Sequence, residues 1–96
     1  MILVIGGRYQ GKHDFSDREF PGRPKKDLID LYKDPGFLSA LPEDTVLIAE
    51  ETGSGVVPVS AADNAFREEY NRALLTAADK ADRVYRVFCG IGKRLG

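Results

Sequence analysis

The sequence is poor in the residues that build covalent or metal-bound frameworks. Its 96 residues include one cysteine, Cys89, and one histidine, His13. A single cysteine excludes an internal disulfide and a cysteine-built metal cluster, and a lone imidazole excludes a site made of several histidines. The serines have no nearby histidine–acid pattern, so a nucleophilic hydrolase is not indicated. Cys89 lies in an apolar run, where we expect a small buried thiol.

Long apolar runs and an excess of one charge are also missing. No stretch approaches the roughly 20 apolar residues that span a bilayer. The apolar residues 1–5 are too few for a signal peptide and lack a basic flank, so we expect a cytoplasmic protein that does not bind membranes. The formal net charge is −1, which gives no general attraction to nucleic acid or anionic lipid. Any bound anion must therefore be held by a local site.

Three apolar runs predict strands near residues 2–6, 45–50 and 84–89. The first is apolar on both faces, as in a central parallel strand that is covered on both sides. A helical stripe predicts a long helix over residues 60–81, with these residues on its apolar side: Phe66, Tyr70, Ala73, Leu74, Ala77 and Ala81. Strands that alternate with helices predict an α/β fold, a small three-layer domain of residues 1–96 around a three-stranded, mostly parallel sheet.

The connecting segments are less regular. A helix is expected to begin near Gly11, and Pro21 limits it to about two turns. Residues 20–26 have the composition of an irregular, basic connection, and their lysines and arginine are expected to be solvated. Leu28, Leu31 and Tyr32 have helical spacing within residues 27–33.

The strongest local motif follows the first strand, and its residues are Gly6, Gly7, Arg8, Tyr9, Gln10, Gly11, Lys12 and His13. They fit the pattern G-x-x-x-x-G-K-[ST] except at the last position. In that pattern glycines let backbone N–H groups curl around phosphate, and the lysine reaches the outer phosphates. The start of the following helix also favours an anion. The motif therefore predicts nucleotide or phosphate binding by a P-loop-like domain, with Lys12 as a catalytic residue if chemistry occurs.

His13 stands where the pattern has a hydroxyl that ligates Mg²⁺. Mg²⁺ prefers hard oxygen donors, and imidazole is a poor ligand for it. We therefore expect ATP or GTP to bind without a metal ion held at position 13, and no metal-ligating residue is assigned. His13 itself could be a general base, a phosphate donor or a plain surface residue.

Glu50 and Glu51 follow the second predicted strand, and a glycine-rich loop, Thr52 to Pro58, comes next. In open α/β sheets the ligand crevice lies beyond the carboxyl ends of the strands. These carboxylates could therefore contact a metal or a water molecule or act as an acid/base group, and Glu51 would be a catalytic residue that positions a metal or a substrate hydroxyl. The alternative is solvated charge at the end of a strand.

The segment Glu51-Thr52-Gly53-Ser54-Gly55-Val56-Val57-Pro58 resembles E-V-G-x-G-I-V-P of the adenosylcobinamide kinase/guanylyltransferase family of cobalamin biosynthesis. Phe66-Arg67-Glu68 resembles the start of that family's F-R-D-L-A-G-R-x-N-Q helix, and Ala81-Asp82-Arg83-Val84-Tyr85 resembles its A-D-E-V-Y entry into the last strand. Residues 1–12 resemble its opening strand and G-G-x-x-S-G-K-S loop. These matches lie at both ends of the chain and in the family's order.

The resemblance implies a P-loop type of nucleotide-binding fold and trimeric assembly. It also implies phosphorylation of adenosylcobinamide with ATP or GTP, followed by transfer of GMP through a guanylylated histidine. The family chain is about twice as long, and its middle, which carries that histidine, has no counterpart here. Gln10 and His13 replace two serines of the family's loop, and Leu74 and Leu75 stand at its N-Q pair.

These matches and departures predict a shortened, homo-oligomeric relative that binds a nucleotide or phosphate and has lost guanylyl transfer. If it is an active enzyme, it is a nucleotide-dependent kinase with a cobinamide substrate. The alternative is a non-catalytic regulatory or interaction subunit derived from that enzyme.

Overall fold

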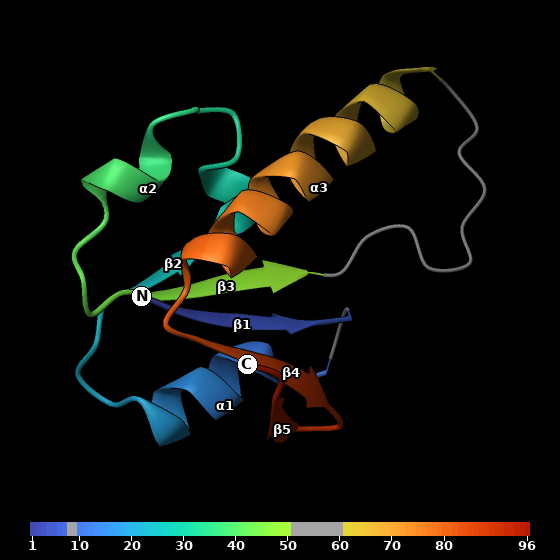
Figure 1. Ribbon diagram of the computed structural model, residues 1–96. Coiled ribbons are helices and arrows are strands. Elements are labelled where there is room, and N and C mark those ends of the chain that lie inside the picture. The colour runs from blue at the N-terminus through green and yellow to red at the C-terminus, as the bar shows by residue number, and fades with distance from the viewer. Residues whose placement is uncertain (8–9, 51–60) are drawn as a thin grey trace.

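The computed structural model describes the backbone of residues 1–7, 10–50 and 61–96, and side chains of the last range from Ala65 onward. Five strands form one sheet in the order β2-β3-β1-β4-β5. Their bounds are β1 Ile2–Gly6, β2 Lys25–Asp27, β3 Val46–Glu50, β4 Arg83–Phe88 and β5 Ile91–Arg94. Strands β2, β3, β1 and β4 run parallel to one another, and β5 pairs antiparallel with β4. Figure 1 shows β1 in the middle of this sheet.

The three strands that the apolar runs predict are confirmed, and so is their parallel arrangement, because β1 pairs in parallel with both β3 and β4. The prediction of a three-stranded sheet is wrong, because β2 and β5 complete a five-stranded mixed sheet. Lys25–Asp27 forms a strand within what we expected to be an irregular basic connection. Both added strands lie at the edges of the sheet, where polar side chains are tolerated and apolar patterning is weak.

Helix α1 (Lys12–Glu19) covers one face of the sheet and helix α3 (Ala61–Lys80) covers the other, which gives the expected three layers (Figure 1). Two short elements, η1 (Leu28–Asp30) and α2 (Phe37–Ala40), connect β2 to β3. The helix suggested by the spacing in residues 27–33 is therefore only a single 3₁₀ turn. Among the residues that the structure describes, no helix is long and apolar enough to span a membrane.

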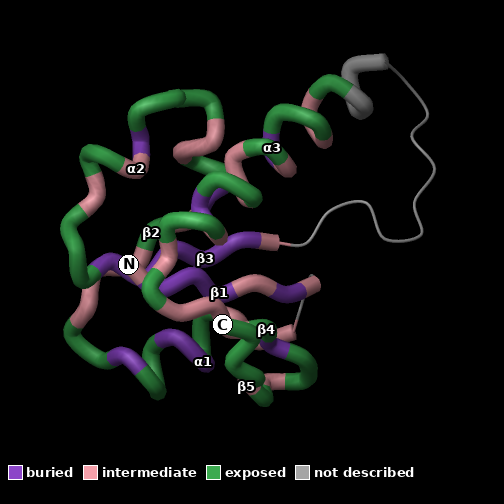
Figure 2. The backbone as a smooth tube through the Cα atoms, in the orientation of Figure 1, coloured by how far each residue is buried: buried purple, intermediate pink, exposed green. Residues whose placement is uncertain are grey.

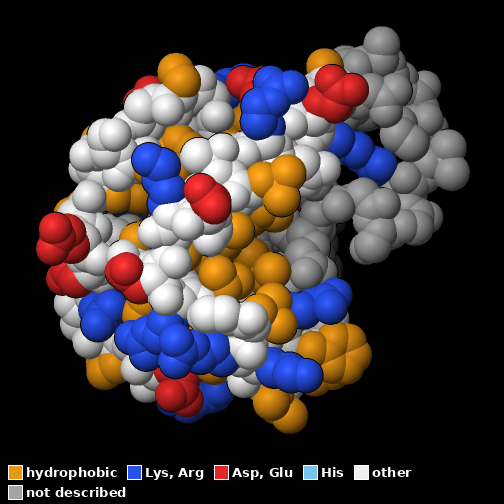
Figure 3. Space-filling model, in the orientation of Figure 1, with side chains coloured by type: hydrophobic (Ala, Val, Ile, Leu, Met, Phe, Trp, Pro, Cys, Tyr) orange, Lys and Arg blue, Asp and Glu red, His pale blue; other side chains and the backbone are white. Residues whose placement is uncertain are grey.

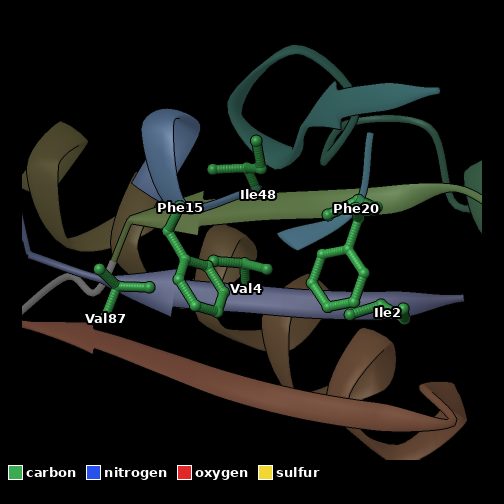
Figure 4. Packing of buried hydrophobic residues seen from close by; sticks show 7 residues of the cluster. Ile2, Val4, Phe15, Phe20, Ile48 and Val87 are labelled. Atoms are coloured by element: carbon green, nitrogen blue, oxygen red, sulfur yellow. The ribbon is translucent and has the colours of Figure 1, made fainter. Parts of the chain in front are cut away.

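The core beneath α1 consists of one face of the central strands and two phenylalanines. Its buried residues are Ile2, Val4, Phe15, Phe20, Val46, Ile48 and Val87. Figure 4 shows both rings lying over the strands, and the two rings meet edge-on with centroids 6.2 Å apart. Successive strand residues point to opposite faces, so the intervening residues form the second core under α3.

That second core contains Leu3, Leu28, Phe37, Leu47, Ala49, Tyr70 and Ala77. The predicted apolar stripe of α3 packs against it in full, which confirms the assignment of the long helix. Figure 2 shows the buried residues concentrated in β1, β3 and the helix surfaces that face them. The continuous apolar run of β1 is therefore explained by burial on both faces.

The hairpin from β4 to β5 turns at Cys89 and Gly90, whose φ angles are 51° and 77°. Two successive positive φ angles match the twist that a two-residue hairpin requires. The prediction that Cys89 is a buried strand residue is wrong, because it lies in this turn and its side chain is exposed.

Candidate functional site

The loop of the G-x-x-x-x-G-K motif lies at the carboxyl end of the central strand. β1 ends at Gly6 and α1 begins at Lys12, so the expected strand–loop–helix arrangement is confirmed. Gly11 precedes the helix with a φ of 83°, a left-handed conformation that suits glycine. No side chain caps the start of α1. Arg8 and Tyr9 lie outside the described residues.

Lys12 reaches back across the loop. Its ammonium nitrogen Nζ donates a hydrogen bond of 2.7 Å to the main-chain oxygen of Gly7. The lysine is partly buried, and its aliphatic stem runs beside Gly6. Lys12 is the one cation of the motif among the described residues, and its ammonium group lies over the loop.

Gly6 is required by close packing. A Cβ atom at this position would lie 2.7 Å from the main-chain oxygen of Val87 and 3.3 Å from the side chain of Lys12. A backbone oxygen in a strand cannot move aside cheaply, so a larger residue would displace β1 from β4. This glycine belongs to the scaffold of the loop.

Gln10 connects the loop to the β4–β5 hairpin. Its side-chain oxygen Oε1 accepts a hydrogen bond of 2.7 Å from the N–H of Cys89, and its main-chain oxygen accepts one of 2.8 Å from the N–H of Gly90. The sequence pattern treats position 10 as part of the phosphate cradle and gives no sign of this role. The glutamine side chain already has a partner in the turn.

His13 lies on the first turn of α1 with 63% of its side chain exposed. Its Nε2 atom is 2.9 Å from Oδ1 of Asp27, the last residue of β2. Of the roles left open for His13, a surface position is the one that its exposure fits. The sequence did not identify Asp27 as a site residue, because β2 was not predicted. Its carboxylate at the end of a strand is the feature that could have indicated it.

Carboxyl ends of parallel strands gather at one edge of the sheet, so β1, β2 and β3 bring Gly6, Asp27 and Glu50 to the same edge. Glu50 pairs in register with Gly6, and its N–H donates a 3.0 Å hydrogen bond to the hydroxyl of Tyr70. Glu51 and the glycine-rich segment 52–58 lie outside the part of the chain that the structure describes.

A groove of about 460 Å³ runs between α1 and the hairpin. It is lined by Phe15, Arg18, Glu19, Phe20, Arg83, Tyr85, Gly90, Ile91 and Gly92. Gly90 joins this groove to the loop, because its N–H is bonded to Gln10 and its Cα lies next to Gly11. Arg18 spans the groove and donates a hydrogen bond of 3.0 Å to the main-chain oxygen of Gly90.

Mg²⁺ is implied by the loop pattern, but the described residues do not fit it. Position 13 offers an imidazole nitrogen that is engaged with Asp27, and the described residues contain no group of three His, Cys, Asp or Glu that could hold a metal ion. Mg²⁺ requires near-octahedral oxygen ligands, and the described residues around His13 do not supply that donor set.

Residues 28–95 match the family model described as cobinamide kinase / cobinamide phosphate guanyltransferase. The chain belongs to this family. The match covers β3, α3 and the β4–β5 hairpin, and it includes residues 51–58, 66–68 and 81–85, which resemble the family. It begins after the loop at residues 6–13, so the motif there rests on its own pattern and geometry. No curated protein matches the chain.

Membership in the cobinamide kinase / cobinamide phosphate guanyltransferase family relates this chain to cobalamin biosynthesis and to proteins that bind nucleotides. It thereby confirms the resemblance drawn from residues 66–85.

Proposed function

We propose that the chain binds the phosphates of a nucleotide, ATP or GTP, on the loop Gly6–His13. The observation that carries this proposal is the position of Lys12, whose ammonium lies 2.7 Å from the Gly7 carbonyl at the end of the central strand. An anion that displaces this carbonyl gains the same charge-assisted bond. The uncapped start of α1 adds backbone N–H groups and a favourable partial charge.

The groove beside α1 supports a nucleotide rather than free phosphate alone. It opens next to the loop at Gly90, and its volume of about 460 Å³ leaves space for a nucleoside. Its buried rings Phe15 and Phe20 provide an apolar floor. In this proposal Gly6, Gly7 and Gln10–His13 hold the phosphates together with Arg8 and Tyr9.

Chemistry at this site would be phosphoryl transfer to a cobinamide hydroxyl. Lys12 would neutralise the charge that develops on the transferred phosphoryl group, and Glu51 would position the acceptor hydroxyl. The engaged imidazole at position 13 argues for binding without a metal ion at that residue. Guanylyl transfer is outside the proposal, because the family's guanylylated histidine has no counterpart in this sequence.

The proposal is tested by calorimetric titration with ATP, GTP, GDP and inorganic phosphate, each with and without Mg²⁺. We expect weak nucleotide binding with little gain from Mg²⁺. Lys12→Ala should weaken it about ten- to a hundredfold, because a charge-assisted hydrogen bond contributes roughly 1.5–3 kcal/mol. Lys80→Ala removes an exposed lysine at the end of α3 and is the matched control. Absence of binding at millimolar ligand would refute the proposal.

The second candidate is a non-catalytic interaction subunit of the same family. The observation that favours it is the large apolar exposure of the β4–β5 hairpin, where Phe88 and Ile91 are 70% and 74% exposed. A chain that does not bind nucleotide but does bind another protein through the β4–β5 hairpin would establish this function instead. Homo-oligomer formation also stays a prediction, and light scattering above the 10.6 kDa of one chain would support it.

A further inference from the structure

The β4–β5 hairpin exposes large apolar side chains on one face. Phe88 and Ile91 are directly opposite each other in the antiparallel register, so their side chains lie on the same face of the sheet. Leu95 donates its N–H to the main-chain oxygen of Val84, which continues this ladder and places Leu95 on that face too. Phe88, Ile91 and Leu95, here called the hairpin strip, are 70%, 74% and 53% exposed.

The hairpin strip lies on the α3 side of the sheet. Val84 pairs with Leu3, a residue of the core under α3, and strand residues two apart share a face. Helix α3 crosses the sheet nearer β3, and none of the helices that the structure describes lies in front of the hairpin (Figure 1). Figure 3 shows hydrophobic side chains over β4 and β5 on this face, with Lys and Arg side chains among them.

β5 is also an edge strand, because the sheet order ends with it. Antiparallel hydrogen bonds alternate along a strand, and the Leu95 N–H points inward to β4. The N–H groups of Gly92 and Arg94 therefore point outward, toward a strand that could be added. An added strand would meet Ile91, Lys93 and Leu95 on one of its faces and Arg94 on the other.

The positive charge of the hairpin favours an acidic partner. Residues 83–96 contain Arg83, Arg86, Lys93 and Arg94 and no acidic residue, while the rest of the chain carries all 15 acidic residues. Two hairpins pairing edge to edge would bring like charges together. The other edge strand, β2, begins with Lys25 and Lys26, so pairing of β5 with β2 of a second copy would do the same.

We propose that β5 and the hairpin strip bind an extended segment of another protein in which apolar and acidic side chains alternate. Its backbone pairs with the outward groups of Gly92 and Arg94. Its apolar side chains cover Ile91 and Leu95, and its carboxylates on the other face meet Arg94. Main-chain pairing supplies affinity and the alternating side chains supply selectivity, as in other cases of strand addition. This proposal is independent of nucleotide binding at the loop.

The first test measures fluorescence anisotropy of a labelled ten-residue peptide of alternating valine and glutamate, with reductant present to keep Cys89 from cross-linking. We expect this peptide to bind at least tenfold more tightly than its valine–lysine counterpart. Ile91→Ser should weaken binding at least tenfold. Leu75→Ser is the matched control, since Leu75 is 72% exposed on α3, and should leave binding unchanged. Equal binding of both peptides, or equal loss in both variants, would overturn the proposal.

A second test separates backbone pairing from charge. Arg94→Ala removes only the side chain, whereas Arg94→Pro also removes the outward N–H while leaving the inward bonds of β5 in place. We expect Arg94→Pro to bind the acidic peptide several-fold more weakly than Arg94→Ala, with circular dichroism unchanged. Identical binding by the two variants would exclude strand addition. Light scattering on the parent and Ile91→Ser is the last check, because an oligomer lost in Ile91→Ser would assign the strip to a second copy and overturn the proposal.

Discussion

The side-chain oxygen of Gln10 lies 2.7 Å from the backbone nitrogen of Cys89, although 79 residues separate them in sequence. The contact joins the loop after β1 to the turn between β4 and β5. The Gln10 side chain takes the place of a water molecule as acceptor for the Cys89 N–H. Both residues of this turn, Cys89 and Gly90, have positive φ angles. The geometry of the candidate phosphate loop is therefore coupled to the position of the hairpin.

We predict that Gln10→Ala destabilises the protein by about 1 kcal/mol, the usual net contribution of one hydrogen bond. The N–H of Cys89 should also exchange with solvent faster, since its acceptor is removed. Urea unfolding and amide hydrogen exchange measure the two effects. Gln10→Glu keeps an acceptor oxygen and should restore slow exchange at Cys89. Unchanged exchange in Gln10→Ala would show that the contact does not hold the turn.

We predict that Gly92→Ala is destabilising although glycine to alanine is often neutral in an edge strand. A Cβ atom at Gly92 would overlap Cε2 and Cζ of Phe15, so the ring must move out of its place under α1. Overpacking of this kind costs about 1–3 kcal/mol. Gly36→Ala is the control, since its nearest contact is an ordinary 3.6 Å to Asp34. In a Phe15→Leu background the cost of Gly92→Ala should fall, and an undiminished cost would contradict the clash.

We predict that the free energy of unfolding falls in alkali because of Tyr70. Burial is the main cause that raises the pKa of Tyr70 above its ordinary 10.0; the hydrogen bond from the Glu50 N–H lowers it in part, and the charges of Glu50 and Asp27 raise it further. The folded state therefore holds the phenolic proton more tightly than the unfolded chain. This contribution is complete below pH 10 and is lost as the pH rises from 10 through the higher pKa of the folded state.

Tyr70→Phe is the variant that checks this dependence. It should lower stability at neutral pH by about 1–3 kcal/mol, because the partly buried N–H of Glu50 loses the Tyr70 hydroxyl as acceptor. The fall in stability above pH 10 should then be shallower than in the parent. Urea unfolding between pH 8 and pH 11 compares the two proteins, and parallel curves would show that Tyr70 does not titrate with unfolding.

The sequence predicts the buried elements of this fold and misses the exposed ones. β1 and β3 are covered on both faces, so their runs of Ile, Leu and Val identify them, and the stripe from Phe66 to Ala81 identifies α3. β2 contains only Lys25, Lys26 and Asp27, and no apolar pattern marks it. β5 has glycine and two basic residues in four positions, because an edge strand has one neighbour and little to bury.

Some features of the candidate site can be predicted from the sequence, and others cannot. The order strand, glycine loop, lysine and helix is local, so the motif predicts the placement of Lys12. The bond from Cys89 to Gln10 and the pair of His13 with Asp27 join segments that are distant in sequence. No spacing rule within one sequence indicates such contacts. Arg8, Tyr9 and Glu51 lie outside the described residues, and their assigned roles stay predictions.

We predict that His13→Ser makes nucleotide binding depend on Mg²⁺. Serine supplies the hard oxygen donor that imidazole lacks, and the change also releases Asp27 from its contact with Nε2. Titration of ATP with and without Mg²⁺ should show at least a tenfold gain from the metal in His13→Ser. His13→Ala releases Asp27 without adding a hydroxyl and should show no such gain. A similar gain in both variants would assign the effect to Asp27 alone.

The central position of β1 has a consequence for how the chain reaches this fold. Ile2 pairs with Val46 on one side and with Arg83 on the other, so both ladders of the innermost strand join segments that are far apart in sequence. Closing such long loops costs chain entropy before any packing compensates for it. Folding should accordingly be slower than in helical domains of this size, and β1 stays without its second neighbour until residues 83–88 arrive. Until then one edge of β1 keeps unpaired backbone N–H and C=O groups, which could pair with β1 of another unfolded chain.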